Sequence, residues 1–596
     1  MYAIVKYLQF PPSSATFNRA IFLADEGDSY GHILQQEENI DSTLAISPST
    51  TCTRAFSTIY FSNGKDAAEA RDKITQALHK GQGFFSYAGH GGETSFTGKK
   101  LWSVNAINET KYSHAPIAMY ATCDEFSFDR KDGGMAEASL YNEDGGFIAI
   151  VAACRTVYMQ FNQYINRAFT CELFNANEKD LIGDVFRRAR NRAATEIVDR
   201  TLGVNTLCYN LAGDPAIPLY KPNLNVTTTS INNIEVKDSS TYQISPLSKN
   251  LFVGQITDKN GNVQESFNGA ITLSLYDGPN LYSSYTKDKT TYVVPYDSII
   301  TVPSDKFNPY HSNDSIEILL DENLLAEITV PVTNGKFEAT LVAPVPQKSN
   351  SVNRLSYFAI SDDKKNRAIG HFNLISISEY NAETAISDNS APVIEQCYIN
   401  EPSFNNGDIV GNDFMFYANI ASDESGINTS DGTIGLTSTL SLDGKKSYPF
   451  VSSAITNNPD GSATIAFPVS NIEDGQHTLT LSVADNAGNR ANYTISFVVI
   501  NRSAQVSLNV AETPARTEAT FSIKHNFLEE PFGRIVIEDN NGSTIFSKAN
   551  CSFPFTWDLK DSNGILVEDG NYKAYVILNG GNQFSSSEKT QVIVVK

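Results

Sequence analysis

Two short apolar segments each lead into a residue that can take part in nucleophilic chemistry. Residues 83–88 run into His90-Gly91, and residues 116–121 run into Cys123. A thiol attacks a carbonyl carbon as the thiolate, and a neighbouring imidazole can take its proton. Glycines beside the histidine let backbone N–H groups come close to a substrate, where they can hold the oxyanion of a tetrahedral intermediate. The pattern predicts acyl transfer through Cys123 with His90 as general base and acid.

The spacing of these residues predicts that they lie together. His90 and Cys123 are separated by 123 − 90 = 33 residues, about one strand–crossover–strand unit. In an open α/β sheet, sites form outside the carboxyl ends of the strands, so both side chains would face one crevice. A cysteine after an apolar strand is most often a small buried residue. The combination of His-Gly after one strand and Cys after the next favours the catalytic interpretation.

The other thiols are weaker candidates. Cys154 also follows an apolar run and is the rival nucleophile, but it lies a further strand away from His90, so we expect a structural role. Cys52, Cys171 and Cys208 fall in predicted loop or helix contexts and are interpreted as packing residues. The seven cysteines form no CxxC pair or zinc-type spacing, and their odd number argues against a complete disulfide framework.

The first 222 residues alternate apolar strands with amphipathic helices. This order is typical of a mostly parallel sheet covered by helices, because strands without polar alternation are buried on both faces. The predicted strands cover residues 20–24, 83–88, 116–121 and 146–153, and the predicted helices cover residues 66–79, 134–141, 161–175 and 181–198.

After Pro222 the helical patterns stop, and the chain is rich in Ser, Thr, Asn and Val. Alternating strands and Asn-Gly or Asp-Gly turns predict all-β sandwich domains. Polar linkers suggest boundaries that give domains at residues 1–222, 223–386, 387–502 and 503–596. The third piece resembles bacterial immunoglobulin-like modules, and the fourth resembles carboxy-terminal sandwich domains of secreted proteins.

Composition limits the possible functions. The chain has 596 residues, with 45 basic and 67 acidic side chains, so its formal net charge is 45 − 67 = −22. Such acidity argues against general nucleic-acid binding. No apolar stretch approaches the length of a membrane-spanning helix. The amino terminus lacks the pattern of a secretory signal, so we expect either a cytosolic protein or a fragment of a longer precursor.

The motifs together resemble the gingipain-type cysteine peptidases, a caspase-like group. The resemblance covers roughly residues 17–221 and includes the His90-Gly91 and Cys123 strand ends, the acidic strand end Asp25-Glu26, the stretch 36–40 (Gln-Glu-Glu-Asn-Ile) and the Gly-Asp-Pro stretch at 213–215. It implies a caspase-like α/β catalytic domain followed by Ig-like sandwiches. An upstream subdomain and a propeptide, usual in the family, would be missing here.

The resemblance assigns roles to individual residues. Cys123 would be the nucleophile, His90 the general base and acid, and Gly91 an oxyanion N–H donor. Glu26 would orient the imidazole of His90, although an exposed turn carboxylate is an equally good interpretation. Arginine-specific members carry an aspartate in the primary specificity pocket where Leu34 aligns, so the resemblance implies a preference for small or uncharged residues. A shift of the alignment would place Glu37 or His32 there.

The layout of the β region, especially residues 252–269, resembles the sortase of the type IX secretion system within this family. The resemblance implies an exported protein on the bacterial cell surface or outer membrane, with an outer-membrane anchoring protein as a partner. It would cleave carboxy-terminal sorting domains from cargo proteins and transfer the cargo to anionic lipopolysaccharide. The chemistry requires no cofactor; structural calcium is left open by the acidic sequence. The alternatives are a secreted gingipain-like endopeptidase and a non-catalytic surface adhesin.

Overall fold

The architecture comes from a computed structural model of the chain. It describes residues 2–9, 15–25, 31–57, 68–97, 100–112, 114–129, 133–142, 145–196, 205–237, 240–278, 280–285, 291–295, 315–319, 323–346, 352–430, 436–448, 451, 454–500, 506–525, 531–580 and 583–595. Contacts divide the chain into two compact units. The first unit comprises residues 1–406, 415–469 and 478–496, and the second comprises residues 407–414, 470–477 and 497–596.

The amino-terminal part is built on a six-stranded sheet in the order β2-β1-β3-β7-β8-β9. Four of its strand pairings are parallel, and only β8 and β9 pair in the antiparallel sense. The prediction of a mostly parallel sheet is therefore confirmed. The strands are β1 (Arg19–Ala24), β2 (Thr51–Phe56), β3 (Phe84–Ala88), β7 (Ile117–Ala121), β8 (Ala149–Ala153) and β9 (Tyr209–Gly213).

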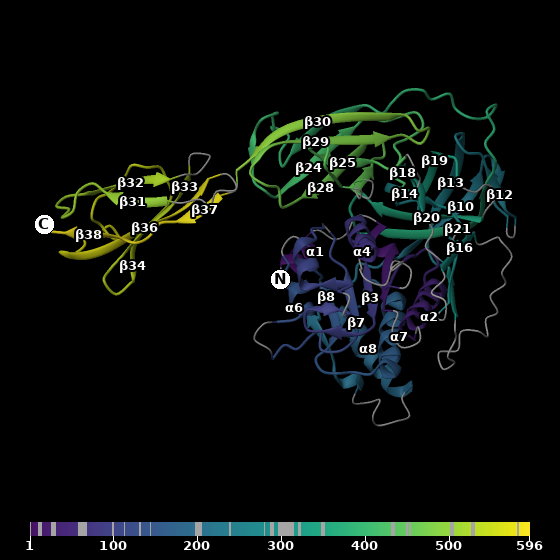
Figure 1. Cartoon of the computed structure of the whole chain (residues 1–596), viewed down its shortest axis with the longest axis horizontal. Helices are drawn as coiled ribbons and strands as arrows, with labels where there is room; N and C mark the ends of the chain where they lie inside the picture. Colours follow the sequence, from purple (N-terminus) through teal and green to yellow (C-terminus); the bar gives the residue numbers. More distant parts are fainter. Residues whose placement is uncertain are drawn as a thin grey trace. The chain divides into compact units, whose positions relative to one another are not determined.

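Helices cover both faces of this sheet (Figure 1). Alternate side chains of each strand enter different cores: Phe22 packs with the core of α2, α7 and α8, and Ile21 packs with that of α4, α5 and α6. The result is a three-layer α/β/α domain. The helices are α1 (Tyr2–Gln9), the 3₁₀ turn η1 (Ala15–Asn18), α2 (Gly31–Ile46), α4 (Ala68–Lys80), α5 (Val104–Glu109), α6 (Met135–Tyr141), α7 (Met159–Asn175) and α8 (Ile182–Glu196).

Three features of this domain differ from the sequence interpretation. The strand β2 carries Cys52, so its placement in a loop or helix was wrong. Helix α2 begins at Gly31, whereas the resemblance places the start of a helix at the stretch 36–40, and its first turn is buried. The antiparallel β9 closes the sheet at its far edge. Its pairing depends on long-range contacts that local patterns do not encode.

Residues 224–377 contain strands and no helix among the described residues. Most of them form one sheet with the central order β18-β14-β20-β21-β10-β13-β19, to which β11 and β12 are added. Their bounds are β10 (Leu224–Ile231), β11 (Ile234–Glu235), β12 (Tyr242–Ile244), β13 (Lys249–Thr257), β14 (Gly269–Tyr276), β18 (Leu324–Val332), β19 (Lys336–Val342), β20 (Val352–Ser361) and β21 (Arg367–Ile377). A separate small sheet joins β15 (Asn280–Tyr285), β16 (Thr291–Pro295) and β17 (Ser315–Leu319).

The following stretch forms two further sheets, β22-β24-β28-β27 and β23-β30-β29-β25-β26. Their strands are β22 (Ile394–Ile399), β23 (Ile409–Val410), β24 (Phe414–Ile420), β25 (Thr439–Leu442), β26 (Lys446–Tyr448), β27 (Ile455–Asn457), β28 (Ala463–Val469), β29 (Gly475–Ala484) and β30 (Arg490–Val499). Buried side chains alternate with partly buried ones along β24 and with exposed or partly buried ones along β28, as expected for a sheet with one face in a core.

The last stretch has its own apolar core around Trp557, made of residues between 508 and 594. It forms the sheets β31-β32-β35 and β34-β33-β36-β37, with β38 added beside β36. The strands are β31 (Val506–Val510), β32 (Ala519–His525), β33 (Phe532–Glu538), β34 (Thr544–Cys551), β35 (Phe555–Trp557), β36 (Gly570–Gly580), β37 (Gln583–Ser586) and β38 (Thr590–Val594). The region after residue 222 is thus strand-rich as predicted, while the three boundaries between the four predicted domains stay a prediction.

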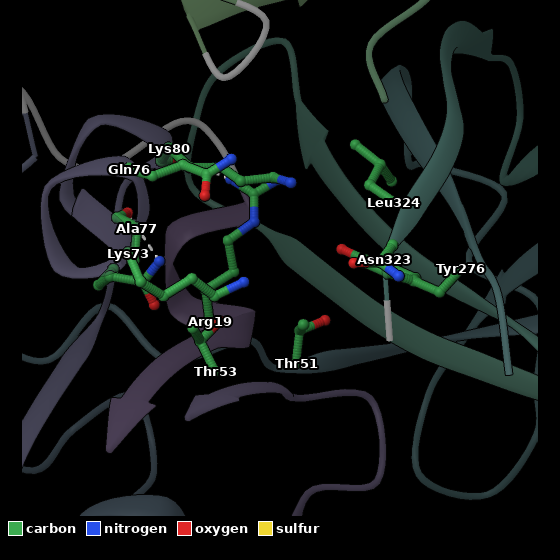
Figure 2. A pocket seen from close by; sticks show the side chains of 11 residues that line it. Arg19, Thr51, Thr53, Lys73, Gln76, Ala77, Lys80, Tyr276, Asn323 and Leu324 are labelled. Atoms are coloured by element: carbon green, nitrogen blue, oxygen red, sulfur yellow. Dashed lines mark hydrogen bonds between the residues drawn. The ribbon is translucent and has the colours of Figure 1, made fainter. Parts of the chain in front are cut away.

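Within the first unit, β20 lies against the amino ends of the parallel strands. Arg354 Nη2 donates to Thr51 Oγ1 at 3.0 Å, and Ser356 Oγ donates to the carbonyl oxygen of Ser49 at 3.1 Å. A small cavity of about 40 Å³ lies beside these contacts. Figure 2 shows Lys73, Gln76 and Lys80 of α4 on one side of it and Tyr276, Asn323 and Leu324 on the other. The carboxyl ends of the strands, where the predicted site lies, are at the opposite edge.

Candidate active site

The register of two neighbouring strands brings His90 and Cys123 to the same level. β3 and β7 pair in parallel, and the last paired Cα positions are Ala88 and Ala121. His90 lies two residues beyond the first, and Cys123 lies two residues beyond the second. Adjacent strands run about 4.8 Å apart, so both residues leave the sheet side by side at its carboxyl edge. The predicted adjacency of their strands is confirmed.

The thiol of Cys123 is half-buried and held by a neighbouring loop. Its Sγ donates to the carbonyl oxygen of Val157 at 3.1 Å and accepts from the Val157 N–H at 3.4 Å. Burial raises the pKa of the Cys123 thiol; the Val157 hydrogen bond opposes this shift, and the nearby Asp124 and Glu125 add to it. The side chain is therefore a thiol in the resting protein and needs a base to become a nucleophile.

The imidazole of His90 is exposed, as access to a substrate requires. The ring of His32, which is buried in the first turn of α2, packs edge-on against it with the centroids 5.2 Å apart. The backbone carbonyl of His90 accepts bonds from the Tyr87 hydroxyl and from the Thr97 N–H. Two hydrogen bonds to this carbonyl group therefore hold the loop that carries the imidazole.

Gly91 lies in a tight position that only glycine fits. It begins the two-residue strand β4 (Gly91–Gly92), which pairs with β5 (Ser95–Phe96); β5 in turn pairs with β6 (Trp102–Ser103). A Cβ at position 91 would come within 2.4 Å of Thr122 Oγ1 and 2.5 Å of Glu125 Oε1. Both of these side chains are fully buried. The His90-Gly91 loop is thus packed directly on the residues that flank Cys123.

Glu125 is a fully buried acid beside the site. Burial raises its pKa well above the usual range, the Gly92 N–H lowers it, and the charges of Asp124 and Glu137 raise it further. The net direction is upward. The carboxyl group fills the space between the Gly91 loop and the Cys123 turn.

The turn at Cys123 has a strained backbone. Asp124 adopts a φ of 56°, in the left-handed region that non-glycine residues rarely enter. Its Oδ2 accepts from the Thr156 hydroxyl at 3.3 Å. Such conformations persist where the surrounding structure holds them, and they gather at functional sites.

The resemblance also assigned roles to Glu26 and Leu34. Glu26 lies outside the described residues, so its role stays a prediction; the preceding Asp25 is buried, and its N–H donates to the carbonyl of Ala88. Leu34 lies in α2 with its side chain 8% exposed, in the apolar cluster against which Cys123 packs. Its role in specificity also stays a prediction.

Sequence patterns missed three neighbours of the predicted dyad. His32, Val157 and Glu125 reach the site from α2, from the loop after β8 and from the turn after β7. Glu125 alone had a local signal, since it lies two residues after Cys123. The other two depend on helix and strand packing, which no motif encodes.

The rival thiol Cys154 follows β8, which pairs with β7 and not with β3. This confirms that Cys154 lies one strand further from His90 than Cys123 does. Cys171 is buried in α7, and Cys208 is in the turn that precedes β9. Neither lies on the strand next to β3.

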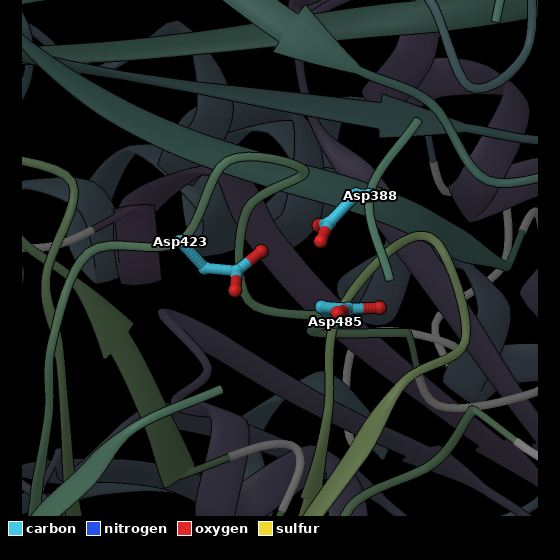
Figure 3. Close-up of side chains that lie close together, drawn as sticks. All are labelled: Asp388, Asp423 and Asp485. Carbon is cyan, nitrogen blue, oxygen red and sulfur yellow. The ribbon is translucent and has the colours of Figure 1, made fainter. Parts of the chain in front are cut away.

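Three carboxylates of the first unit gather away from this site. Oxygen atoms of Asp388, Asp423 and Asp485 lie within 4.8 Å of one another (Figure 3). Burial raises the pKa of Asp423 and of Asp485, and the charge of Asp388 adds to the effect. Oxygen ligands suit Ca²⁺, but the hydrogen bonds from Ser425 and Asn489 already hold two of these groups. Structural calcium therefore stays a prediction.

None of the helices that the structure describes is long and apolar enough to cross a lipid bilayer.

Comparison with known proteins supports the interpretation of the first domain. The sequence model named "Peptidase family C25" matches residues 3–220. No curated protein matches the chain. Among solved structures, the dimeric latent PorU from Porphyromonas gingivalis is 19% identical, with a TM-score of 0.29; the match covers 96% of this chain and 64% of that one. This chain thus spans less than two thirds of PorU.

Two more solved structures show weaker identity. The complex of Porphyromonas gingivalis RgpB pro- and mature domains is 13% identical with a TM-score of 0.33, covering 63% of this chain and 73% of that one. The fibronectin(III)-like modules of Clostridium thermocellum CbhA are 14% identical with a TM-score of 0.19, covering 33% of this chain and 93% of that one.

Proposed function

We propose, from the premise that residues 3–220 form a cysteine-peptidase domain of family C25, that this domain cleaves peptide bonds through an acyl-enzyme on Cys123. One observation carries the assignment of the dyad: the parallel register of β3 and β7 leaves His90 and Cys123 two residues beyond paired positions. The rival Cys154 follows β8, a strand that is not adjacent to β3.

The proposed reaction uses side chains of this chain alone. His90 takes the proton from the Cys123 thiol, and the thiolate attacks the scissile carbonyl carbon. The N–H of Gly91 stabilises the negative charge on the carbonyl oxygen. The tetrahedral intermediate collapses as the C–N bond breaks, and His90 returns the proton to the leaving amine. An acyl-enzyme thioester remains, and no cofactor is required.

The second half of the reaction decides the biological role. In the sortase proposal, an amine attacks the thioester, and the cargo is joined to anionic lipopolysaccharide after loss of its carboxy-terminal sorting domain. We propose this role, on the cell surface and with an outer-membrane anchoring protein as partner, from the motif resemblance of the β region. If water attacks the thioester instead, the protein is a secreted endopeptidase.

A product analysis tests both parts of the proposal. The full chain is incubated with a peptide that spans a cargo sorting junction, with and without an excess of an amino sugar, and the products are weighed by mass spectrometry. We expect cleavage in both cases and an amide product when the amine is present. Hydrolysis alone would support the endopeptidase, and no cleavage would support the adhesin.

Variants tie the products to the site. Cys123→Ala should abolish both products, while Cys154→Ala should leave them. If Cys154→Ala abolished cleavage and Cys123→Ala did not, the assignment of the dyad would be wrong.

A further inference from the structure

Two cysteines lie opposite each other where β8 ends and β9 begins, at the carboxyl edge of the parallel strands. Ala153 and Tyr209 are paired antiparallel positions, so the next pair of residues beyond the ends of these two strands is Cys154 and Cys208. The N–H of Cys154 donates to the carbonyl oxygen of Cys208 at 3.0 Å, which continues the pairing. Such a pair places its Cα atoms about 5.5 Å apart, within the range of about 4.4–6.8 Å found in disulfides.

The side chains of this pair lie on the same face. Asn210 and Cys208 are two residues apart, so they share one face of the strand. Asn210 Nδ2 donates to Cys154 Sγ at 3.4 Å and to the Cys208 carbonyl oxygen at 3.1 Å. The thiol of Cys154 therefore lies over the same face as that of Cys208. Both side chains are only partly buried, so a small reagent can reach them.

The sulfur of Cys154 also acts electrostatically on the thiol of Cys208. Burial raises the pKa of the Cys208 thiol, the nearby Cys154 raises it further, and Arg155 lowers it. Cys123 is engaged elsewhere, because its sulfur exchanges hydrogen bonds with Val157. Among the described thiols, the geometry singles out the pair of Cys154 and Cys208.

We propose that Cys154 and Cys208 form a reversible disulfide by exchange with a low-molecular-weight disulfide. One protein thiolate attacks a sulfur of the reagent, forms a mixed disulfide and releases one reagent thiolate. The second protein thiolate then attacks the protein sulfur of the mixed disulfide and releases the other reagent thiolate. The protein loses two protons and two electrons, and the reagent gains them as two thiols.

The cross-link would control the loop that holds the nucleophile. Residues 154–158 carry Val157, the partner of Cys123, and the Tyr158 N–H donates to Asn205 Oδ1 at 2.8 Å. The disulfide would join the first residue of this loop to the turn before β9. In the reduced protein, the main-chain hydrogen bond from Cys154 to Cys208 joins the two segments at this point. The cross-link itself does not depend on the proposed peptidase activity, so the two can fail separately.

Peptide mapping tests the cross-link directly. The reduced full chain is incubated with increasing oxidised glutathione, alkylated with iodoacetamide and digested with trypsin. Cleavage after Arg130, Lys131 and Arg155 puts Cys123, Cys154 and Cys208 on three different peptides. We expect a species lighter by two hydrogen atoms, with the peptides of Cys154 and Cys208 linked and Cys123 alkylated. Dithiothreitol should reverse the change.

Thermal unfolding adds a second readout. The linkage closes a loop of about 55 residues and should raise the Tm by roughly 3–10 °C. Cys208→Ser and Cys154→Ser should each abolish the linked peptides and the shift, whereas Cys171→Ser, at a buried site in α7, should keep both. Linkage through Cys123, stable mixed disulfides without a cross-link, or no loss of hydrogen would each overturn the proposal.

Discussion

The thiol of Cys123 donates a hydrogen bond to the main-chain carbonyl of Val157 at 3.1 Å, across the ends of two neighbouring strands. Burial raises the pKa of the Cys123 thiol, the Val157 hydrogen bond opposes this shift, and the charges of Asp124 and Glu125 add to it. The net direction is upward, which favours the thiol in the resting site. Nucleophilic attack requires the Cys123 thiol to give up its hydrogen bond to Val157 and to pass its proton to a base.

The charge of Asp124 should tune this activation. Asp124 raises the pKa of Cys123, so Asp124→Asn should lower that pKa and increase the thiolate fraction at a given pH. Asparagine accepts the positive φ at this position. Alkylation of Cys123 by iodoacetamide, followed as a function of pH, should shift its midpoint to lower pH. The control is Asp129→Asn, in the same loop but paired with the exposed Arg155; an equal shift there would contradict a local effect.

The nucleophile assignment is tested by a matched pair of cysteine variants. Cys123→Ala removes the attacking sulfur, so peptidase activity should fall about a thousandfold or more. Cys154→Ala removes a similar sulfur one strand away and should keep most activity. Circular dichroism should show both variants folded. Activity that survives the first substitution would exclude Cys123 as the nucleophile.

The glycine at position 91 should be indispensable, whereas its neighbour should not. In Gly91→Ala the new Cβ meets Thr122 and Glu125 at 2.4–2.5 Å, and both side chains are fully buried. We expect kcat/KM to fall at least about tenfold, or 1.4 kcal/mol. In Gly92→Ala the nearest atom is 4.0 Å away, so that variant is the control. Equal activity of the two variants would argue against the tight contact.

The family resemblance predicts a substrate preference from Leu34. It places this apolar residue where arginine-specific members carry a carboxylate, so a guanidinium group would find no buried partner. Peptides that differ only at the cleaved position should show no arginine advantage in kcat/KM. A preference above about a hundredfold, or 2.7 kcal/mol, would remove Leu34 from the pocket.

The terminal β stretch should be dispensable for chemistry. Its apolar core is made of residues between 508 and 594, so deletion of residues 503–596 should leave the peptidase activity of the purified protein unchanged within about twofold. The resemblance of this stretch to carboxy-terminal sandwich domains of secreted proteins predicts a type IX secretion-type sorting or docking domain, so the truncated protein should be lost from the cell surface. Surface retention, measured by protease shaving, would show that the stretch only stabilises its neighbour.

Local patterns predicted the parts of the fold that depend on neighbouring residues. Fully apolar runs gave β3, β7 and β8 to within three residues, because strands buried on both faces carry an unbroken signal. The antiparallel β9 and the strand that carries Cys52 were missed. These depend on pairing between distant segments, which periodicity does not record.

The candidate site likewise combines residues that local patterns identify with residues that only the packing of distant segments brings in. His90 and Cys123 were found because each follows a strand that the sequence marks clearly. His32 approaches from α2, whose first turn is buried through packing on the sheet rather than through a helical apolar stripe. Val157 contributes its main chain, and any residue type can do that, so no side-chain pattern could have identified it.

The contacts at the amino ends of the strands have a consequence for the order in which the protein matures. Arg354 and Ser356 of β20 bond to Thr51 and Ser49 near the start of the chain, more than three hundred residues earlier. During synthesis the parallel sheet emerges from the ribosome first, and it lacks these two hydrogen bonds until β20 has been made. The β-rich segment through about residue 360 must therefore be synthesised before these two hydrogen bonds can support the parallel sheet.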